Sequence, residues 1–474
     1  MIFSGTTFIF YFLPLLLILY YILPEKFQNT ILIIFSLFFY VYGDVKFLPL
    51  LLITGIVNYF LSRKIRNKSV LIVGIILNIL PLLYFKYTNF IIDIINSITS
   101  FNIDLFDLIL PLGISFTTFR MISFLIDAHN NKIKDITFKK VILYTFLFTY
   151  QIEGPIVRYA DIEDELDKRI ITSSDKEIGT KRFIIGLSKK VILADTLALF
   201  ITSVSGYNTV VSLWLVATLN ILRLYLDFSA YSDMAIGLSL MLGFHFKENF
   251  NYPFINNGMS DFWRKWHISL TSWFKDYIYI PIGGNRCSVI KNIINILIVW
   301  LLTGLWHGAS YTFIIWGLFF GIILILEKYL FKNFVKKHHI LSCIITDILV
   351  IIGFVFFYAK DLPSAFLTIK GMLGLNNLLL INSEVIFYIK NYILILIISI
   401  AVSLNIFKIF KGKLQNIEFI YYLALLILST AYIVDSSFNP FLYFRFWGDY
   451  EKYCNKNFDY LYSFDWHACH SFKG

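Results

Sequence analysis

Long apolar runs are the feature that most constrains this chain. The first, Thr7 to Leu23, has no lysine or arginine before it and no small-residue cleavage pattern after it. It is therefore interpreted as a retained membrane span rather than a secretory signal. Similar runs recur along the sequence, and candidate spans fall near 7–23, 30–43, 46–61, 69–86, 106–127, 139–152, 207–226, 290–307, 310–326, 343–358, 385–406 and 417–434.

The composition agrees with a polytopic membrane protein of all-α class. The chain is 58% hydrophobic and 15% charged, with a mean hydropathy of +0.71, which is far more apolar than an ordinary soluble domain. Some runs, especially 30–43 and 139–152, are short for a complete crossing. Such runs predict tilted, re-entrant or broken helices, which a membrane tolerates where protein or a water-filled cavity covers the freed backbone.

The net charge of +10 indicates orientation rather than nucleic-acid binding. By the positive-inside rule, basic loops of a membrane protein face the cytoplasm. Counting spans backward from the first of these loops places the N-terminus outside. The basic loops are residues 63–68, 132–140, 328–337 and 408–413.

Three segments are more polar than the rest. Residues 161–182 carry mixed charges and predict a surface helix pair between two membrane halves. Residues 183–200, around Lys189 and Lys190, alternate at helical spacing and predict an interfacial amphipathic helix. The membrane domain is expected to cover 1–446, and residues 447–474 are expected to form a loosely ordered tail.

No metal site or disulfide framework is predicted. The tail contains His467, Cys469 and His470, but these three candidate ligands lack an identifiable fourth ligand and a scaffold. The four cysteines of the chain are scattered without paired spacing.

His307 is the first candidate for chemistry, because a histidine inside a hydrophobic segment is costly in lipid. If the segment is helical through Gly308, its face is small or polar and allows a substrate chain or another helix to approach closely. A structural histidine hydrogen-bonded between helices is the alternative. The residues on that face are Trp300, Thr303, Gly304, Ser310 and Tyr311.

His267 lies in a different setting, among the aromatic and basic residues Trp263, Arg264, Lys265 and Trp266. This mixture is typical of an anchor at the membrane surface. The alternative is a second active-site group, beside basic residues that hold a donor carrying phosphates or a carboxylate.

Two further motifs contain polar residues. Asp227 and Asp233 are six residues apart, so on one helix they point to different faces and make a poor catalytic pair. A structural role, such as capping a helix or neutralising Arg223, is the more economical account of Asp227. Pro281 to Arg286 (PIGGNR) is a glycine turn rather than a phosphate loop, because no Gly-Lys-Ser/Thr follows it.

Five ordered motifs together resemble the membrane-bound O-acyltransferase (MBOAT) family, and within it the branch that acetylates bacterial polysaccharides. The resemblance runs from Met1 to about Phe446. The motifs are Asp227 to Gly237 (DFSAYSDMAIG), Glu248 to Phe254 (ENFNYPF), Asp261 to Leu270 (DFWRKWHISL), Pro281 to Arg286 (PIGGNR) and Gly304 to Ala309 (GLWHGA).

The resemblance implies a multi-helix bundle of the bacterial cell membrane, with short or re-entrant helices around a central tunnel. His307 matches the essential histidine of the family, and His267 matches its second histidine position. The acyl donor, acetyl-CoA or an acyl carrier, is expected from the cytoplasm, and no bound cofactor is expected. An exported polysaccharide, or a protein that relays acetyl groups outside, is expected to receive the acyl group.

The sequence therefore predicts acyl transfer from a thioester to a hydroxyl, with His307 as general base. His267, Trp306 and Thr303 are expected to orient substrate or to stabilise the oxyanion, and Gly304, Arg264, Trp263 and Asp227 are expected to line the tunnel. D-alanyl or lipid acyl transfer by the same fold is an alternative. A transporter or flippase is another, although no internal repeat of fixed period supports it.

Overall fold

The computed structural model describes residues 1–406 and 417–435, and every regular element in these ranges is helical. The all-α prediction is therefore confirmed for the described residues. The predicted tail, 447–474, lies outside them. The contacts divide the described residues into two units: the first contains residues 1–153, 158–170 and 426–435, and the second contains residues 154–157, 171–406 and 417–425.

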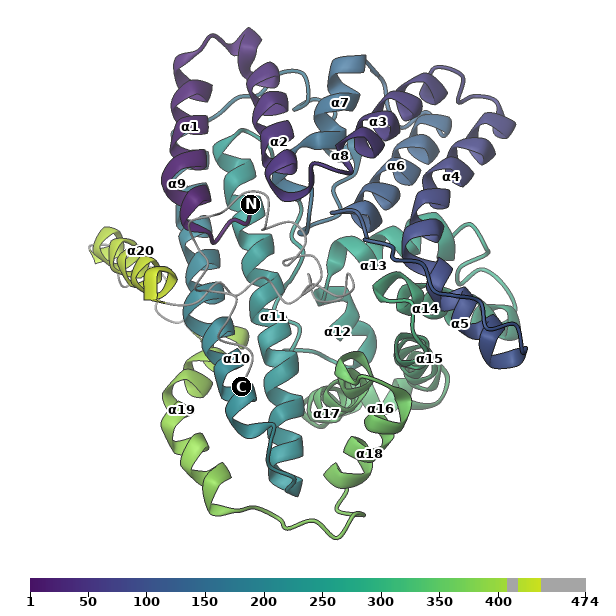
Figure 1. Ribbon diagram of the computed structural model, residues 1–474, viewed down its shortest axis with the longest axis vertical. Coiled ribbons are helices and arrows are strands. Elements are labelled where there is room, and N and C mark those ends of the chain that lie inside the picture. Colours follow the sequence, from purple (N-terminus) through teal and green to yellow (C-terminus); the bar gives the residue numbers. More distant parts are fainter. Residues whose placement is uncertain (407–416, 436–474) are drawn as a thin grey trace. The chain divides into compact units, whose positions relative to one another are not determined.

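The first unit is built from short and medium-length helices (Figure 1). The pair α3 and α7 and the pair α4 and α6 pack against one another within it. Its helices are η1 (Phe8–Phe12), α1 (Leu13–Ile22), η2 (Glu25–Phe27), α2 (Gln28–Asp44), α3 (Leu48–Ser62), α4 (Lys68–Leu82), η3 (Leu83–Tyr87), α5 (Thr88–Ile98), α6 (Ile114–His129), α7 (Phe138–Phe146), η4 (Phe148–Tyr150) and α8 (Tyr159–Ile162).

The second unit contains the longest helix, α11, which runs alongside the continuous rod formed by α9, η5 and α10 (Figure 1). Its helices are α9 (Ser173–Ser188), η5 (Lys189–Ala194), α10 (Asp195–Val204), α11 (Val210–Met241), α12 (Met259–Lys265), α13 (Ile268–Phe274), η6 (Lys275–Tyr279), α14 (Val289–His307), α15 (Tyr311–Leu326), η7 (Glu327–Phe331), α16 (Lys332–Lys337), α17 (His339–Tyr358), α18 (Leu362–Met372) and α19 (Ser383–Ser403). A last helix, α20 (Glu418–Asp435), crosses the boundary between the units.

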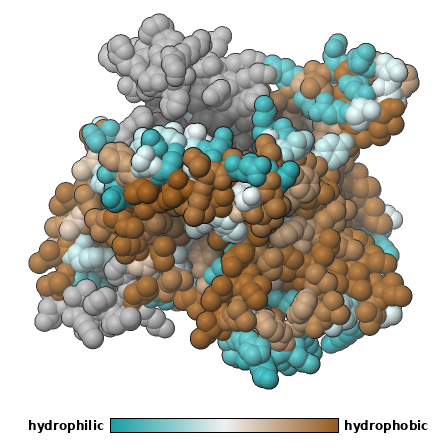
Figure 2. Space-filling view, turned by 90° about the horizontal axis from the view of Figure 1, so that it is seen from below, coloured by the Kyte–Doolittle hydropathy of each residue, from teal (hydrophilic) through white to brown (hydrophobic). Residues whose placement is uncertain are grey.

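Seven helices in the described part of the chain are long and apolar enough to cross a membrane. Large hydrophobic side chains are exposed on them, and Figure 2 shows apolar residues over most of the visible surface, with hydrophilic residues gathered in patches. Apolar surface on this scale is suited to lipid. The candidate spans are Lys68–Ile98, Val210–Met241, Val289–His307, Tyr311–Lys337, His339–Tyr358, Ser383–Ser403 and Glu418–Asp435.

Several predicted spans differ from the helices that form. The run at 106–127 becomes helical only from Ile114, because Gly113 takes a left-handed conformation (φ 71°) and Pro111 precedes it. The runs at 69–86 and 207–226 continue much further, to Ile98 and Met241. Polar residues in both extensions lower the local hydropathy, so the predicted spans ended too early.

The polar segment 161–182 is not a helix pair. It contains the end of the single-turn helix α8, an irregular stretch, and then the start of α9. Thr172 begins α9 through a capping box with Asp175, in which each side chain bonds the backbone N–H of the other.

Helices α14 and α15 approach closely through Gly304 and Gly317. A Cβ atom on Gly304 would collide with the carbonyl of Phe313, and one on Gly317 would collide with the carbonyl of Trp300. Small residues of this kind allow membrane helices to pack backbone to backbone. The expectation that Gly304 permits the approach of another helix is therefore confirmed.

Replacing Gly304 by leucine is expected to lower the free energy of unfolding by about 1–3 kcal/mol through overpacking. Leucine has the better helix propensity, by about 1 kcal/mol, so any loss must come from the collision with α15. Chemical unfolding in detergent measures the change. The matched control is Gly206→Leu, because nothing lies within 4 Å of a Cβ at that position; equal stability of the two variants would contradict this account.

Candidate active site

The helical conformation is interrupted between α12 and α13, at His267. Helix α12 ends at Lys265, Trp266 is extended, and His267 adopts a left-handed conformation with φ 44° before α13 begins at Ile268. Histidine occupies this region more readily than most residues, and such conformations cluster at functional sites. His267 is only 2% exposed. The interpretation favoured by its neighbours, an anchor exposed at the membrane surface, is therefore wrong for His267.

Asn249 holds one edge of the His267 ring. Its Oδ1 lies 3.0 Å from His267 Nδ1, and it also accepts a hydrogen bond from the hydroxyl of Ser269 at 2.8 Å. The ring of Phe228 packs edge-on at 4.7 Å between centroids. His267 Nε2 is buried and has no hydrogen-bond partner among the residues that the structure describes. Burial lowers the pKa of His267 to about 3, so the ring is neutral at physiological pH.

His307 is the last residue of α14, and aromatic rings surround it. Its ring centroid lies 4.9 Å from that of Trp306, 5.0 Å from that of Trp316 and 5.2 Å from that of Phe357. The helix ends here because Gly308 is extended. Ser310 therefore does not share the His307 face, contrary to the prediction from an uninterrupted helix, and Tyr311 begins α15.

Both histidines line the same cavity, which has a volume of about 580 Å³. This volume is typical of sites for small-molecule substrates. Five of the predicted site residues line it, namely His307, His267, Thr303, Arg264 and Trp263, and Trp300 lines it with them.

Two other predicted lining residues are not among those that form the cavity wall. Trp306 is buried, with its ring 6.0 Å from that of His267, and Gly304 is engaged in the contact with α15. Both residues are therefore placed to shape the cavity from behind its wall. Whether they act in catalysis stays a prediction.

The cavity is strongly basic along one side. Three of these basic residues, Lys328, Lys332 and Lys336, were predicted to lie in a cytoplasmic loop, because the predicted span ended at residue 326. The apolar helix in fact continues through η7 and α16 to Lys337, which puts its lysines on the cavity wall. The basic lining residues are Arg264, Lys275, Lys328, Lys332 and Lys336.

Glu327 is the acidic residue of the wall, and the backbone of α12 engages it. Its carboxylate accepts hydrogen bonds from the backbone N–H groups of Met259 and of Ser260, the latter at 3.0 Å. A carboxylate at the start of a helix satisfies donors that have no partner within the helix. Glu327 therefore fixes the element that leads to His267.

The motif at Pro281 to Arg286 forms the predicted glycine turn. Gly283 (φ 120°) and Gly284 (φ 51°) both take positive φ, which confirms that prediction. The turn brings Asn285 to the cavity, where its Oδ1 accepts hydrogen bonds from Lys328 Nζ and from Tyr279 Oη, each at 2.6 Å. The motif thus holds one of the cavity lysines in place.

Asp227 is not among the residues that line this cavity, and its place along a substrate tunnel stays a prediction. Its carboxylate lies 3.0 Å from Lys190 Nζ, which also bonds Asp195 at 2.7 Å. Lys190 is 1% exposed. A structural role for Asp227 agrees with these contacts, in which Lys190 is a buried cation that pairs with it.

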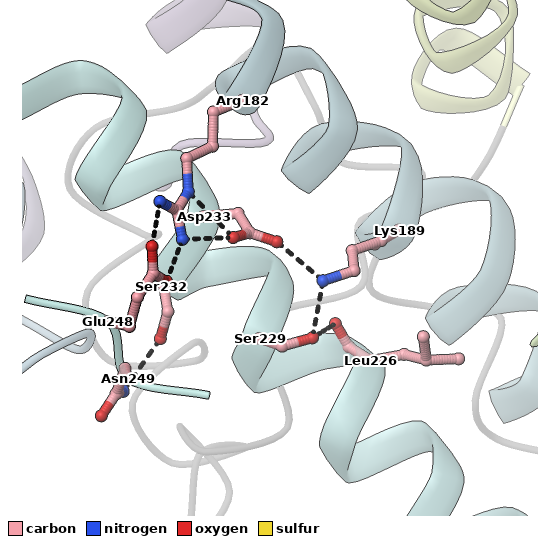
Figure 3. A network of polar contacts seen from close by, with 8 residues as sticks. All are labelled: Arg182, Lys189, Leu226, Ser229, Ser232, Asp233, Glu248 and Asn249. Atoms are coloured by element: carbon pink, nitrogen blue, oxygen red, sulfur yellow. Dashed lines mark hydrogen bonds and ion pairs between the residues drawn. The ribbon is translucent and has the colours of Figure 1, made fainter. Parts of the chain in front are cut away.

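Asp233 faces a different side of α11, as the six-residue spacing predicted. It pairs with Arg182 and with Lys189 (Figure 3). Lys189 and Lys190 thus turn toward α11. The prediction of an interfacial amphipathic helix at 183–200 is wrong for these lysines, because their partners lie on a helix that local sequence cannot reveal.

Comparison with known proteins identifies the family. Residues 113–360 match the MBOAT, membrane-bound O-acyltransferase family. The chain is 41% identical over 389 residues to the "Probable alginate O-acetylase AlgI" of Pseudomonas aeruginosa, covering 78% of this chain and 75% of that protein. It is 32% identical over 517 residues to the peptidoglycan O-acetyltransferase of Helicobacter pylori, covering 94% and 98%.

A more distant relative is the teichoic acid D-alanyltransferase of Bacillus subtilis, which is 29% identical over 335 residues, covering 65% of this chain and 82% of that protein. The chain belongs to the MBOAT family. It is a multi-pass membrane O-acyltransferase that uses an acyl donor. The resemblance found in the motifs is thereby confirmed.

Replacing Lys190 by methionine is expected to lower the free energy of unfolding by about 3–5 kcal/mol, because Asp227 and Asp195 lose the cation between them in a buried setting. Thermal unfolding in detergent measures the loss. Lys181→Met is the matched control, because Lys181 pairs with the exposed Glu177, and exposed pairs contribute about 0–1 kcal/mol. Equal effects of the two substitutions would contradict a buried ion cluster.

Proposed function

We propose that this acyltransferase moves an acetyl group from a thioester to a hydroxyl of an exported polysaccharide. The observation that carries the proposal is that His307 and His267 line the same cavity. Two relatives named for O-acetylation, one acting on alginate and one on peptidoglycan, support acetyl as the acyl group and a polysaccharide as the acceptor. Residues 1–446 are proposed to form the catalytic membrane domain.

His307 is proposed as the general base. A sugar hydroxyl is a weak nucleophile at neutral pH, so a base must take its proton as the oxygen attacks the thioester carbonyl. The new C–O bond forms as the C–S bond breaks, and the thiolate leaves and takes up a proton. The aromatic rings beside His307 make this part of the cavity wall apolar, which disfavours water near the thioester.

The basic side of the cavity is proposed to bind the donor. Lys328, Lys332 and Lys336 follow one another at helical spacing along η7 and α16 and line the cavity together. Ammonium groups bind phosphates through charge-assisted hydrogen bonds. This arrangement supports a donor that carries phosphates, such as acetyl-CoA or a phosphopantetheine-bearing acyl carrier.

The acceptor is proposed to be the polysaccharide itself or a protein that relays acetyl groups to it outside the membrane. We propose with it that the N-terminus lies on the outer side of a bacterial cell membrane and the basic segments lie in the cytoplasm, as the positive-inside rule predicts. The family membership favours this enzyme class over a transporter or flippase. The higher identity to the acetylating relatives favours acetyl over D-alanyl or lipid acyl transfer.

Replacing His307 by glutamine is expected to slow acetyl transfer by about 10²- to 10⁴-fold, the range that a general base contributes. Purified protein is incubated with labelled acetyl-CoA and with alginate or peptidoglycan, and labelled polymer is counted. The matched control is His245→Gln, a histidine that pairs with Asp175 and does not line the cavity. Undiminished transfer by the His307 variant would remove this residue from the mechanism.

The double substitution of Lys332 and Lys336 by glutamine is expected to raise KM for acetyl-CoA about ten-fold or more, because each charged hydrogen bond contributes about 1.5–3 kcal/mol. The short acetyl thioester of N-acetylcysteamine has no phosphates, so its KM is expected to stay the same. Lys360→Gln, outside the cavity, is the control. Equal changes for both thioesters would argue against phosphate recognition here.

A further inference from the structure

We infer that Asn249 is a positioning residue that holds His267 as the Nδ1–H tautomer, which makes His267 Nε2 a hydrogen-bond acceptor for a hydroxyl of the acceptor sugar. The inference rests on the proposed function, because it assigns His267 a task in recognising the acceptor. It gives His267 a role different from oxyanion stabilisation, which was one of the two roles expected for it from the sequence.

The orientation of the Asn249 amide is fixed from both ends. Its Nδ2 donates a hydrogen bond to the hydroxyl of Ser232 on α11 at 3.0 Å (Figure 3). Its Oδ1 therefore faces the break between α12 and α13. There it lies 3.0 Å from His267 Nδ1, 2.8 Å from the Ser269 hydroxyl and 3.3 Å from the Ser269 backbone nitrogen.

An amide oxygen can only accept hydrogen bonds, so the proton of His267 must sit on Nδ1. The backbone reinforces this arrangement. Ile268 N–H donates to the Asn249 carbonyl at 2.8 Å, and Asn251 N–H donates to the Lys265 carbonyl at 2.9 Å. Asn249 is therefore bound to the α12–α13 junction through both its main chain and its side chain.

The tautomer decides what His267 offers to a substrate. With Nδ1 turned to Asn249, Nε2 is the ring nitrogen that has no partner among the described residues, and in this tautomer it carries a lone pair and no proton. A lone pair cannot stabilise an oxyanion, which needs donors. It can accept a hydrogen bond from an O–H group.

The hydroxyl recognised by His267 is not the one that attacks. The attacking hydroxyl has one proton, and in the proposed mechanism it passes that proton to His307. Nε2 must therefore accept from a second hydroxyl of the acceptor, which a sugar supplies and a simple alcohol does not. His267 is thus assigned to the selection of polyhydroxylated acceptors.

The neutral state of His267 follows from its surroundings. The groups packed against the ring are the amide of Asn249, the hydroxyl of Ser269 and the aromatic rings of Phe228, Phe250 and Trp306. These groups carry no charge. The titratable and charged groups that share the cavity are His307, Glu327, Tyr279, Arg264, Lys275, Lys328, Lys332 and Lys336.

The first test reads the tautomer without relying on activity. Nitrogen-15 NMR of the full chain with labelled histidine, in detergent, gives the protonation of both ring nitrogens, and His267→Gln identifies the His267 signals. The expected result is protonated Nδ1 and bare Nε2, with Nε2–H appearing in Asn249→Leu. A protonated Nε2 in the unaltered protein, or no change in the variant, overturns the inference.

The second test measures transfer. Asn249→Leu is expected to lower kcat/KM for the polysaccharide about 10- to 100-fold, the usual effect of losing a partner that orients a functional histidine, with KM for acetyl-CoA unchanged. Asn249→Asp keeps an acceptor oxygen and retains most activity. Its carboxylate raises the pKa of His267, and because neutral His267 is needed, activity is lost at a higher pH on acidification. If Asn249→Asp and the unaltered protein lose activity at the same acidic pH, the inference is overturned.

Asn256→Leu is the matched control, because Asn256 is a buried amide of the same loop that bonds Asp347 rather than the histidine. It is expected to lower stability without changing the tautomer or the acid limb. If it reproduces the Asn249→Leu spectrum, the effect is structural and the inference fails. The His307→Gln result separates the two ideas: full activity there overturns the proposed function, whereas a normal Asn249→Leu enzyme overturns the positioning role alone.

Discussion

The candidate site depends on a chain break that a second segment stabilises. Between Lys265 and Ile268 the backbone leaves the helical path, and backbone polar groups without partners are costly in a low-dielectric setting. Asn249 and Asn251 satisfy groups on both sides of this break. These hydrogen bonds from the loop are what stabilise the end of α12 and the start of α13 on either side of His267.

The ion pairs between α9 and α11 extend the same support. Arg182 bonds Asp233 and Glu248, and Glu248 directly precedes Asn249 in the chain (Figure 3). The loop that carries Asn249 is thus tied to two long helices at once. Arg182, which the sequence predicted on a surface helix, thus helps to fix the position of the neutral His267.

Sequence predicted what local periodicity controls. The face of α14 that bears Trp300, Thr303 and His307 follows directly from helical spacing, and all three residues line the cavity. The face ends at Gly308, because a glycine in an apolar run does not reveal whether the helix continues. The left-handed turn at Gly283 and Gly284 was equally visible in the sequence.

The sequence did not predict the positions of several polar side chains that are buried or line the cavity. His267 has the neighbours of an interfacial residue, yet it is buried because Phe228 and Asn249 approach it from other segments. Lys190 turns inward because Asp227 lies on the next helix. The lysines beyond residue 326 reach the cavity because α15 outlasts its apolar run. For His267 and Lys190 the deciding contact is made by residues far away in the chain, whereas for the lysines it is the length of one helix.

The continuity of α15, η7 and α16 has a mechanical consequence. One rod carries Trp316 against the His307 ring at one end and Lys328, Lys332 and Lys336 at the other. The lysines proposed to bind the donor and the indole that packs on the imidazole thus belong to one continuous segment. If the proposed donor binds these lysines, a single stretch of backbone connects it to the ring that packs against His307.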